Sequence, residues 1–184
     1  MSTWVAFLRA INLGRTRKFA KDDIAAATEA AGFTGVATHI NTGNVRLETR
    51  MRSRARIEES LERAYRDRAG FEVPTICLTD AELRRVVEDA ASLADRLPEG
   101  GTHYVSLLKA EPDAATVAAV QELADAAGEG AGAAVVLPPS RAVHLLVGDP
   151  YHAARLTNAE VERTLGVATN RNLRVLAALV EKWC

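Results

Sequence analysis

The order of strand-like and helix-like segments in the first 78 residues constrains the fold of this chain more than any other feature. Two amphipathic stretches predict helices, one from near Asp22 to Gly32 and one capped by Ser53 and ending near Gly70. Four apolar or alternating segments predict strands: Thr3–Leu8, Val36–Ile40, Val45–Glu48 and Phe71–Leu78. The resulting order, strand, helix, strand, strand, helix, strand, is that of the ferredoxin-like split βαβ arrangement.

Residues 79–184 predict a second half of the same kind. After a first helix near Asp80, the expected elements are a strand, a helix, a hairpin and two further helices: Thr102–Leu108, Pro112–Ala124, Ala133–Leu137 with Ala142–Val147, Ala153–Leu165 and Leu173–Lys182. Thr169 and Asn170 are expected to cap the last helix, which takes the place of a fourth strand. We therefore predict an α+β protein of two ferredoxin-like halves, residues 1–78 and 79–184, the second ending in a helix.

The composition of the chain indicates the cellular compartment in which it is expected. No segment approaches the roughly 20 apolar residues that a membrane span needs, and the N-terminal apolar run lacks a basic region before it. Cys77 lies in an apolar strand and Cys184 is the last residue, so no disulfide framework is indicated. These features predict a cytoplasmic protein without a membrane partner.

Charge is divided unevenly along the chain. The whole chain carries a net charge of −1, which argues against general nucleic-acid binding. Residues 1–78 hold 13 Lys and Arg against 9 Asp and Glu, whereas residues 79–184 hold 10 against 15. Any anionic partner is therefore expected to meet the first half, although a chance difference between two solvated surfaces explains the division nearly as well.

Three motifs together resemble a known family. They are Phe7–Gly14 (FLRAINLG), Thr38–Val45 (THINTGNV) and Ala168–Asn172 (ATNRN), and in their order and spacing they are similar to the bacterial family called domain of unknown function 1697. The resemblance covers essentially the whole chain. It implies an α+β fold of two ferredoxin-like subdomains and no known activity.

The motifs also depart from the usual family pattern. Ala10 stands where glycine is usual, and Arg15 replaces the second glycine of the first motif. Asn170 and Leu173 stand for the usual Met and Trp. With fewer glycines, the backbone of the first loop is less flexible, and this restricts which ligands the loop can bind closely.

Polar motif residues supply the candidate ligand-binding site: Arg9, Asn12, Thr42, Asn44, Asn170, Arg171 and Asn172. Arg9 offers a planar fork for phosphate or carboxylate, and a helix beginning near Asn170 would attract anions. Each has a structural alternative, because Asn12 and Asn44 are turn formers and Arg171 is able to pair inside the protein. The favoured hypothesis is a small anionic ligand or nucleotide held between the two halves.

Other chemistries have little support. The four histidines lack metal-site spacing, so we predict no metal, and no phosphate-binding P-loop, dinucleotide fingerprint or nucleophile motif indicates a cofactor or a catalytic residue. His39, His103 and His144 are expected as half-buried strand residues. The arginine-rich segment Arg50–Arg56 lacks neighbouring aromatic residues, which disfavours nucleic-acid binding. Whether the chain is an enzyme, a nucleic-acid binder or a protein-interaction module, and in which oligomeric state, stays open.

Overall fold

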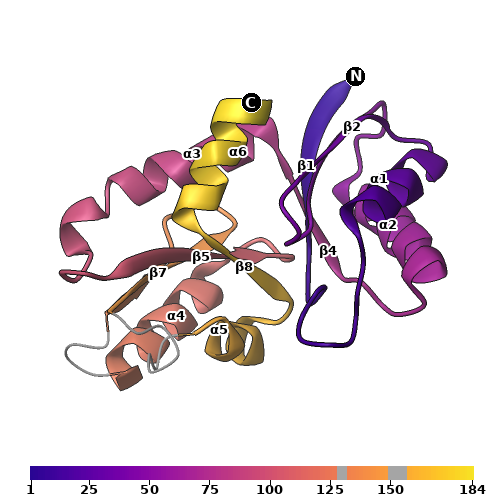
Figure 1. Ribbon diagram of the computed structural model, residues 1–184. Coiled ribbons are helices and arrows are strands. Elements are labelled where there is room, and N and C mark those ends of the chain that lie inside the picture. Colours follow the sequence, from indigo (N-terminus) through magenta and orange to yellow (C-terminus); the bar gives the residue numbers. More distant parts are fainter. Residues whose placement is uncertain (128–131, 149–156) are drawn as a thin grey trace. The chain divides into compact units, whose positions relative to one another are not determined.

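The computed structural model describes residues 1–127, 132–148 and 157–184, which form two compact units. The first covers Met1–Ala81 and the second Glu82–Lys182. Each unit contains a four-stranded antiparallel sheet with helices (Figure 1). The strand orders are β2-β3-β1-β4 in sheet A and β6-β7-β5-β8 in sheet B. The predicted α+β class with two ferredoxin-like halves is confirmed. No helix in the described ranges has the length and apolarity to span a bilayer.

The first unit follows the predicted order of elements. Its elements are β1 Ser2–Leu8, α1 Lys21–Ala30, β2 Thr34–His39, β3 Asn44–Thr49, α2 Arg54–Ala69 and β4 Thr75–Thr79. The two helices cover one face of sheet A (Figure 1). Alternate strand residues such as Trp4, Ala6 and Leu47 point to this face and pack against Leu61 and Tyr65 of α2.

The ends of α2 show why its boundaries are readable from sequence. The Ser53 side chain accepts a hydrogen bond from the backbone N–H of Arg56 at 3.4 Å. At the other end, Gly70 adopts a left-handed conformation with φ of 77° and its N–H bonds the Arg66 carbonyl. A side-chain cap and a left-handed glycine are local features, so sequence alone predicts both.

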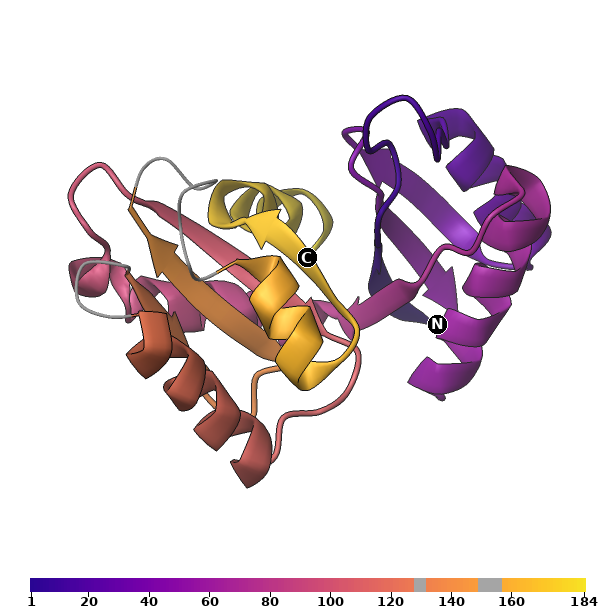
Figure 2. The same cartoon turned by 90° about the horizontal axis from the view of Figure 1, so that it is seen from below.

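The second unit contains a strand that the sequence did not predict. Its elements are α3 Asp80–Ala91, a 3-10 turn η1 Ala94–Arg96, β5 Thr102–Leu108, α4 Ala114–Ala127, β6 Ala133–Val135, β7 Ala142–Val147, α5 Asn158–Leu165, β8 Ala168–Asn172 and α6 Leu173–Trp183. Helices α3 and α6 lie on one face of sheet B, and α4 and α5 lie on the other (Figures 1 and 2). The predicted start of a helix at Ala153 falls outside the described residues.

The segment Ala168–Asn172 is a strand, so its prediction as the start of the last helix was wrong. The segment pairs antiparallel with β5, from Leu108↔Ala168 to Tyr104↔Asn172. Threonine and asparagine favour helix caps locally. The edge of β5, however, offers hydrogen-bond partners to the backbone of the whole segment, and this pairing makes the segment a strand. The second unit thus completes its own strand, helix, strand, strand, helix, strand order before α6 begins.

Side chains of α2 close the outer edge of β4. The buried Glu58 carboxylate accepts the Cys77 N–H at 2.9 Å, Glu62 accepts the Thr75 N–H at 2.8 Å, and Arg54 Nε donates to the Cys77 carbonyl at 3.1 Å. These are the backbone groups that point away from β1, because the alternation of an antiparallel ladder directs every second residue outward. Helix α2 therefore gives this edge strand the partners that a neighbouring strand would supply.

We expect Glu58→Ala to lower the free energy of unfolding by about 1–3 kcal/mol, since it leaves a buried N–H without an acceptor. Urea denaturation of both proteins measures the difference. Glu59→Ala is the matched control, because Glu59 is an exposed neighbour that pairs with exposed Arg63 on the same helix and its loss should cost less than about 0.5 kcal/mol. Equal losses in the two variants would refute the role of Glu58 at the strand edge.

Candidate functional site

Four of the predicted site residues lie at one end of sheet A, in two loops that contact each other. Arg9 directly follows β1, Thr42 lies in the turn between β2 and β3, and Asn44 is the first residue of β3. The Leu8 N–H donates to the Gly43 carbonyl and the Arg9 N–H donates to the Pro74 carbonyl, both at 2.8 Å. The fold thus brings together residues that are more than 30 positions apart in the chain.

Asn12 fastens the two loops. Its Nδ2 donates to the carbonyls of Phe19 at 3.0 Å and Asn41 at 2.8 Å, and its Oδ1 accepts the Phe19 N–H at 3.0 Å. Its backbone has a φ of 55°, a left-handed conformation that asparagine tolerates better than most residues. Because the amide is bonded at both ends to backbone, its role is to fix the shape of the loops.

Arg17 is a second anchor of the same loop. Its Nε donates to the Ala10 carbonyl at 2.6 Å and its Nη2 to the Glu72 carbonyl at 2.5 Å. Its guanidinium also lies 4.6 Å from the centre of the Phe71 ring, in cation–π contact. Sequence reasoning counted Arg17 only as positive charge, because its aromatic and carbonyl partners near residue 72 are far away along the chain.

The turn residues Thr42 and Asn44 bond within their own hairpin. Asn44 is fully buried, and its Nδ2 donates to the His39 carbonyl and to Thr42 Oγ1, both at 3.0 Å. Such side-chain bonds to nearby turn groups are what asparagine provides in hairpin connections. This geometry stabilises the loop that Asn12 holds from the other side.

The exposed part of this region is cationic. Leu13, Arg15 and Lys18 are exposed in the loop that Asn12 and Arg17 anchor. The segment from Arg9 to Ala20 contains four cationic residues and no Asp or Glu. Gly14 has a φ of 60°, and a side chain added there would meet nothing within 4 Å, so the tip of the loop is open. We refer to Arg9–Ala20 as the basic loop.

The other three predicted site residues belong to the second unit, on β8. Arg171 is buried, and its Nη1 donates to Thr169 Oγ1 at 3.0 Å and to the Asn170 carbonyl at 2.7 Å. Burial lowers the pKa of its guanidinium to about 10, so the group keeps its charge at neutral pH. Asn170 donates to Ser106 Oγ at 3.3 Å, and Asn172 Oδ1 caps α6 by accepting the Arg174 N–H at 2.8 Å.

The second unit contains a pair of contacting histidines that the sequence did not predict. His103 Nε2 and His144 Nδ1 are 3.0 Å apart, and both side chains are buried. Burial lowers the pKa of His103, and burial together with the neighbouring His103 lowers that of His144 to about 4. Sequence analysis placed both residues in strands, but only the pairing of β5 with β7 brings their side chains together.

The described residues contain no group of three or more side chains able to hold a metal ion. His152 lies outside the described residues. The histidine pair by itself supplies two nitrogen ligands and no third, and each ring already bonds the other.

These features define a class of protein: an α+β chain of two split βαβ units that carries a basic loop on the first. The chain belongs to the family described as proteins of unknown function (DUF1697), whose model matches residues 1–134. Among solved structures, the conserved bacterial protein SP0830 from Streptococcus pneumoniae shares 16% sequence identity with a TM-score of 0.70, covering 98% of this chain and 97% of that one. No curated protein matches the sequence.

Proposed function

We propose that the basic loop binds a small phosphate-bearing ligand, with Arg15 and Lys18 as the contacting cations. The observation that carries the proposal is a cationic loop, free of carboxylates, whose backbone is fixed by Asn12 and Arg17. A fixed loop loses little conformational entropy when a ligand binds, so more of the interaction energy of its charges is retained in the binding free energy. Arginine and lysine are the side chains that proteins use for phosphate recognition.

The open tip of the loop supports the same ligand class. Gly14 leaves space around its backbone, so a phosphate oxygen has room to approach the N–H groups near this turn. In this proposal Asn12, Thr42 and Asn44 build the site without touching the ligand. A contribution of Asn170, Arg171 and Asn172 to an anion site stays a prediction.

The test is a titration with inorganic phosphate, a sugar phosphate and a nucleoside monophosphate, followed by thermal shift and calorimetry. The wild-type protein should gain melting temperature with at least one of them. Arg15→Ala combined with Lys18→Ala should weaken binding at least about tenfold, because two charge-assisted contacts are lost.

Arg52→Ala combined with Arg56→Ala is the matched control. It removes the same charge from an exposed arginine-rich segment outside the basic loop, so it should leave the affinity unchanged. Equal weakening by both double variants would mean that binding is only a response to net charge. No stabilisation of the wild-type protein by any of the three compounds would refute the proposal.

A further inference from the structure

The two units have the same strand order, so the second unit shows how much chain the fold needs at the position of the basic loop. Strand β5 leaves sheet B as β1 leaves sheet A, because the Leu108 N–H donates to the Arg141 carbonyl of the neighbouring hairpin at 3.0 Å. Five residues, 109–113, then join β5 to α4, whereas twelve residues, 9–20, join β1 to α1. The architecture does not require the extra length of the basic loop, and such additional loop length commonly serves binding.

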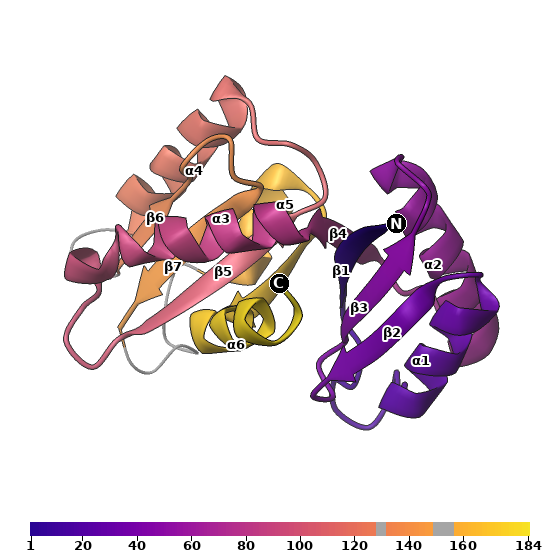
Figure 3. The same ribbon diagram turned by 90° about the horizontal axis from the view of Figure 1, so that it is seen from above.

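Two exposed apolar side chains accompany the cations of the basic loop. Leu13 is 61% exposed in the loop, and Ile40 is 46% exposed at the start of the turn between β2 and β3, the hairpin strands that lie side by side in Figure 3. These residues flank one contact, because Asn12 Nδ2 donates to the Asn41 carbonyl at 2.8 Å. Two of the four large apolar residues that are exposed in the described chain therefore belong to the same pair of joined loops.

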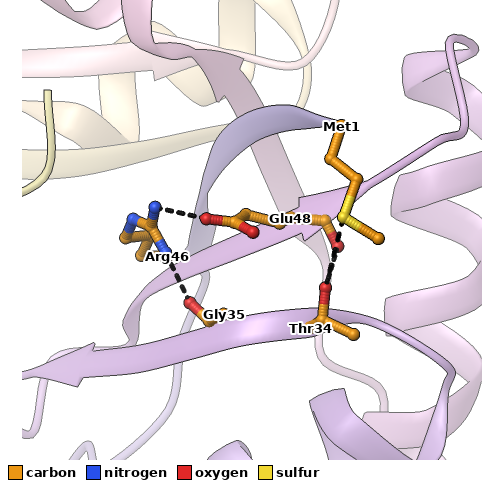
Figure 4. A network of polar contacts seen from close by, with 5 residues as sticks. All are labelled: Met1, Thr34, Gly35, Arg46 and Glu48. Carbon is orange, nitrogen blue, oxygen red and sulfur yellow. Dashed lines mark hydrogen bonds and ion pairs between the residues drawn. The ribbon is translucent and has the colours of Figure 1, made fainter.

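The cations of the basic loop are not neutralised by protein partners. Among the described residues, the side chains of Arg15 and Lys18 have no hydrogen bond or ion pair. The far end of the β2–β3 hairpin differs, since Arg46 there donates to the Glu48 carboxylate at 2.6 Å and to the Gly35 carbonyl at 2.7 Å (Figure 4). A cation that already holds a carboxylate attracts an anion less. The basic loop thus combines uncompensated positive charge with exposed apolar surface.

On the basis of the phosphate site proposed above, we infer that the phosphate bound by the basic loop is esterified to an aliphatic group, which packs on Leu13 and Ile40. Inorganic phosphate would leave both apolar side chains in water. An aliphatic ester removes apolar surface from water on the ligand and on the protein, and this burial adds to the affinity. Because Asn12 holds the two loops together, one ligand contacts the charges and the apolar side chains without reorganising the loops.

Calorimetric titration with hexyl phosphate and glycerol phosphate tests this inference, since the two esters share the phosphate and differ in the polarity of the attached group. The wild-type protein should bind hexyl phosphate at least about tenfold more tightly, because the burial of about two methylene groups gives that factor. Leu13→Asn combined with Ile40→Asn should abolish the difference and leave the affinity for glycerol phosphate unchanged. Asparagine tolerates the φ of 49° at residue 40, so this double variant should keep its melting temperature.

Val167→Asn is the matched control, because Val167 is an apolar residue of the second unit with a similar exposed fraction, 42%. This variant should keep the preference for hexyl phosphate. Equal wild-type affinities for the two esters would overturn the inference and leave the phosphate site in place, whereas binding of neither ester would refute the phosphate site itself. A preference that persists in the double variant would also overturn the inference, because the aliphatic group would then bind elsewhere.

Vesicles distinguish a phospholipid from a soluble ester as the source of the aliphatic phosphate. The comparison is co-sedimentation with phosphatidylcholine vesicles, with and without phosphatidic acid. Binding that requires phosphatidic acid and is lost in the double variant would identify a lipid headgroup, because anionic headgroups and the bilayer interior satisfy the cations and the apolar side chains together. A preference for hexyl phosphate without vesicle binding would assign the site to a soluble aliphatic phosphate ester.

Discussion

Acidification from pH 6.5 toward pH 4 should destabilise this protein through His144. The His144 pKa is about 4 in the folded chain because the ring is buried beside His103, whereas it is near 6.5 in an unfolded chain. Between these values the unfolded state binds a proton that the folded state does not, so stability rises with pH. The contribution is fully present above pH 6.5 and is lost progressively down to pH 4, for a total of about 3 kcal/mol.

The geometry explains why the pair resists protonation. His103 Nε2 and His144 Nδ1 share one hydrogen bond, and protonation of both rings would set N–H against N–H. His144 Nε2 is also buried and has no hydrogen-bond partner among the described residues, so a charge on that ring has no compensating acceptor there. Protonation of His103, whose pKa is also lowered, would act in the same direction.

Urea denaturation at pH 7.5, 6, 5 and 4.5 measures this effect over most of the interval between the two pKa values. The comparison is with His144→Leu, because acid effects from surface carboxylates are common to both proteins and cancel in the difference. The wild-type protein should lose more stability than the variant as the pH falls. Parallel pH profiles for the two proteins would contradict the prediction, because they would show that His144 binds its proton equally well in the folded and unfolded states.

Gly43→Ala should lower the free energy of unfolding by about 2–4 kcal/mol. Gly43 has a φ of 75°, and an added Cβ would lie 2.7 Å from Leu8 Cβ and 2.8 Å from Ile11 Cδ1. The backbone conformation costs about 1–2 kcal/mol for a residue with a side chain, and overpacking adds about 1–3 kcal/mol. The Leu8 Cβ is close to the main chain, so it has little freedom to move aside.

Gly70→Ala separates the two contributions. Gly70 has nearly the same φ, 77°, but nothing lies within 4 Å of an added Cβ. Thermal or urea unfolding should therefore show a loss of about 1–2 kcal/mol for this variant, from the backbone conformation alone. If the two alanine variants are equally destabilised, Gly43 is required only for its φ and the contact between the loops is looser than the distances indicate.

The first motif also contains a strained backbone conformation close to Gly43. Ala10 has a φ of 55° at the position where the family motif usually has glycine. Ala10, Asn12, Arg17 and Ile40 are the non-glycine residues of the described chain with positive φ, and all four lie in the two loops that Asn12 joins. Strained backbone gathers at functional sites more often than elsewhere, which agrees with placing the proposed ligand here.

Sequence by itself determined the order of the elements in the first unit, the ends of α2 and the family. The period of apolar residues, the Ser53 cap and the left-handed Gly70 all act within a few residues of one another, so local chemistry is enough to predict them. The segment Ala168–Asn172 is a place where local sequence did not predict the structure. Its polar residues favour a helix cap locally, and only the edge of β5 makes them a strand.

Tertiary structure alone decided what the site residues do. Asn12 was predicted with both a ligand-binding and a structural role, and its bonds to Phe19 and Asn41 show that it fastens two loops. The joining of His103 to His144 and the closing of β4 by Glu58 depend on which strands and helices become neighbours. Such contacts span tens of residues, and nothing in the local sequence encodes them, because they form only when the sheet brings its strands together.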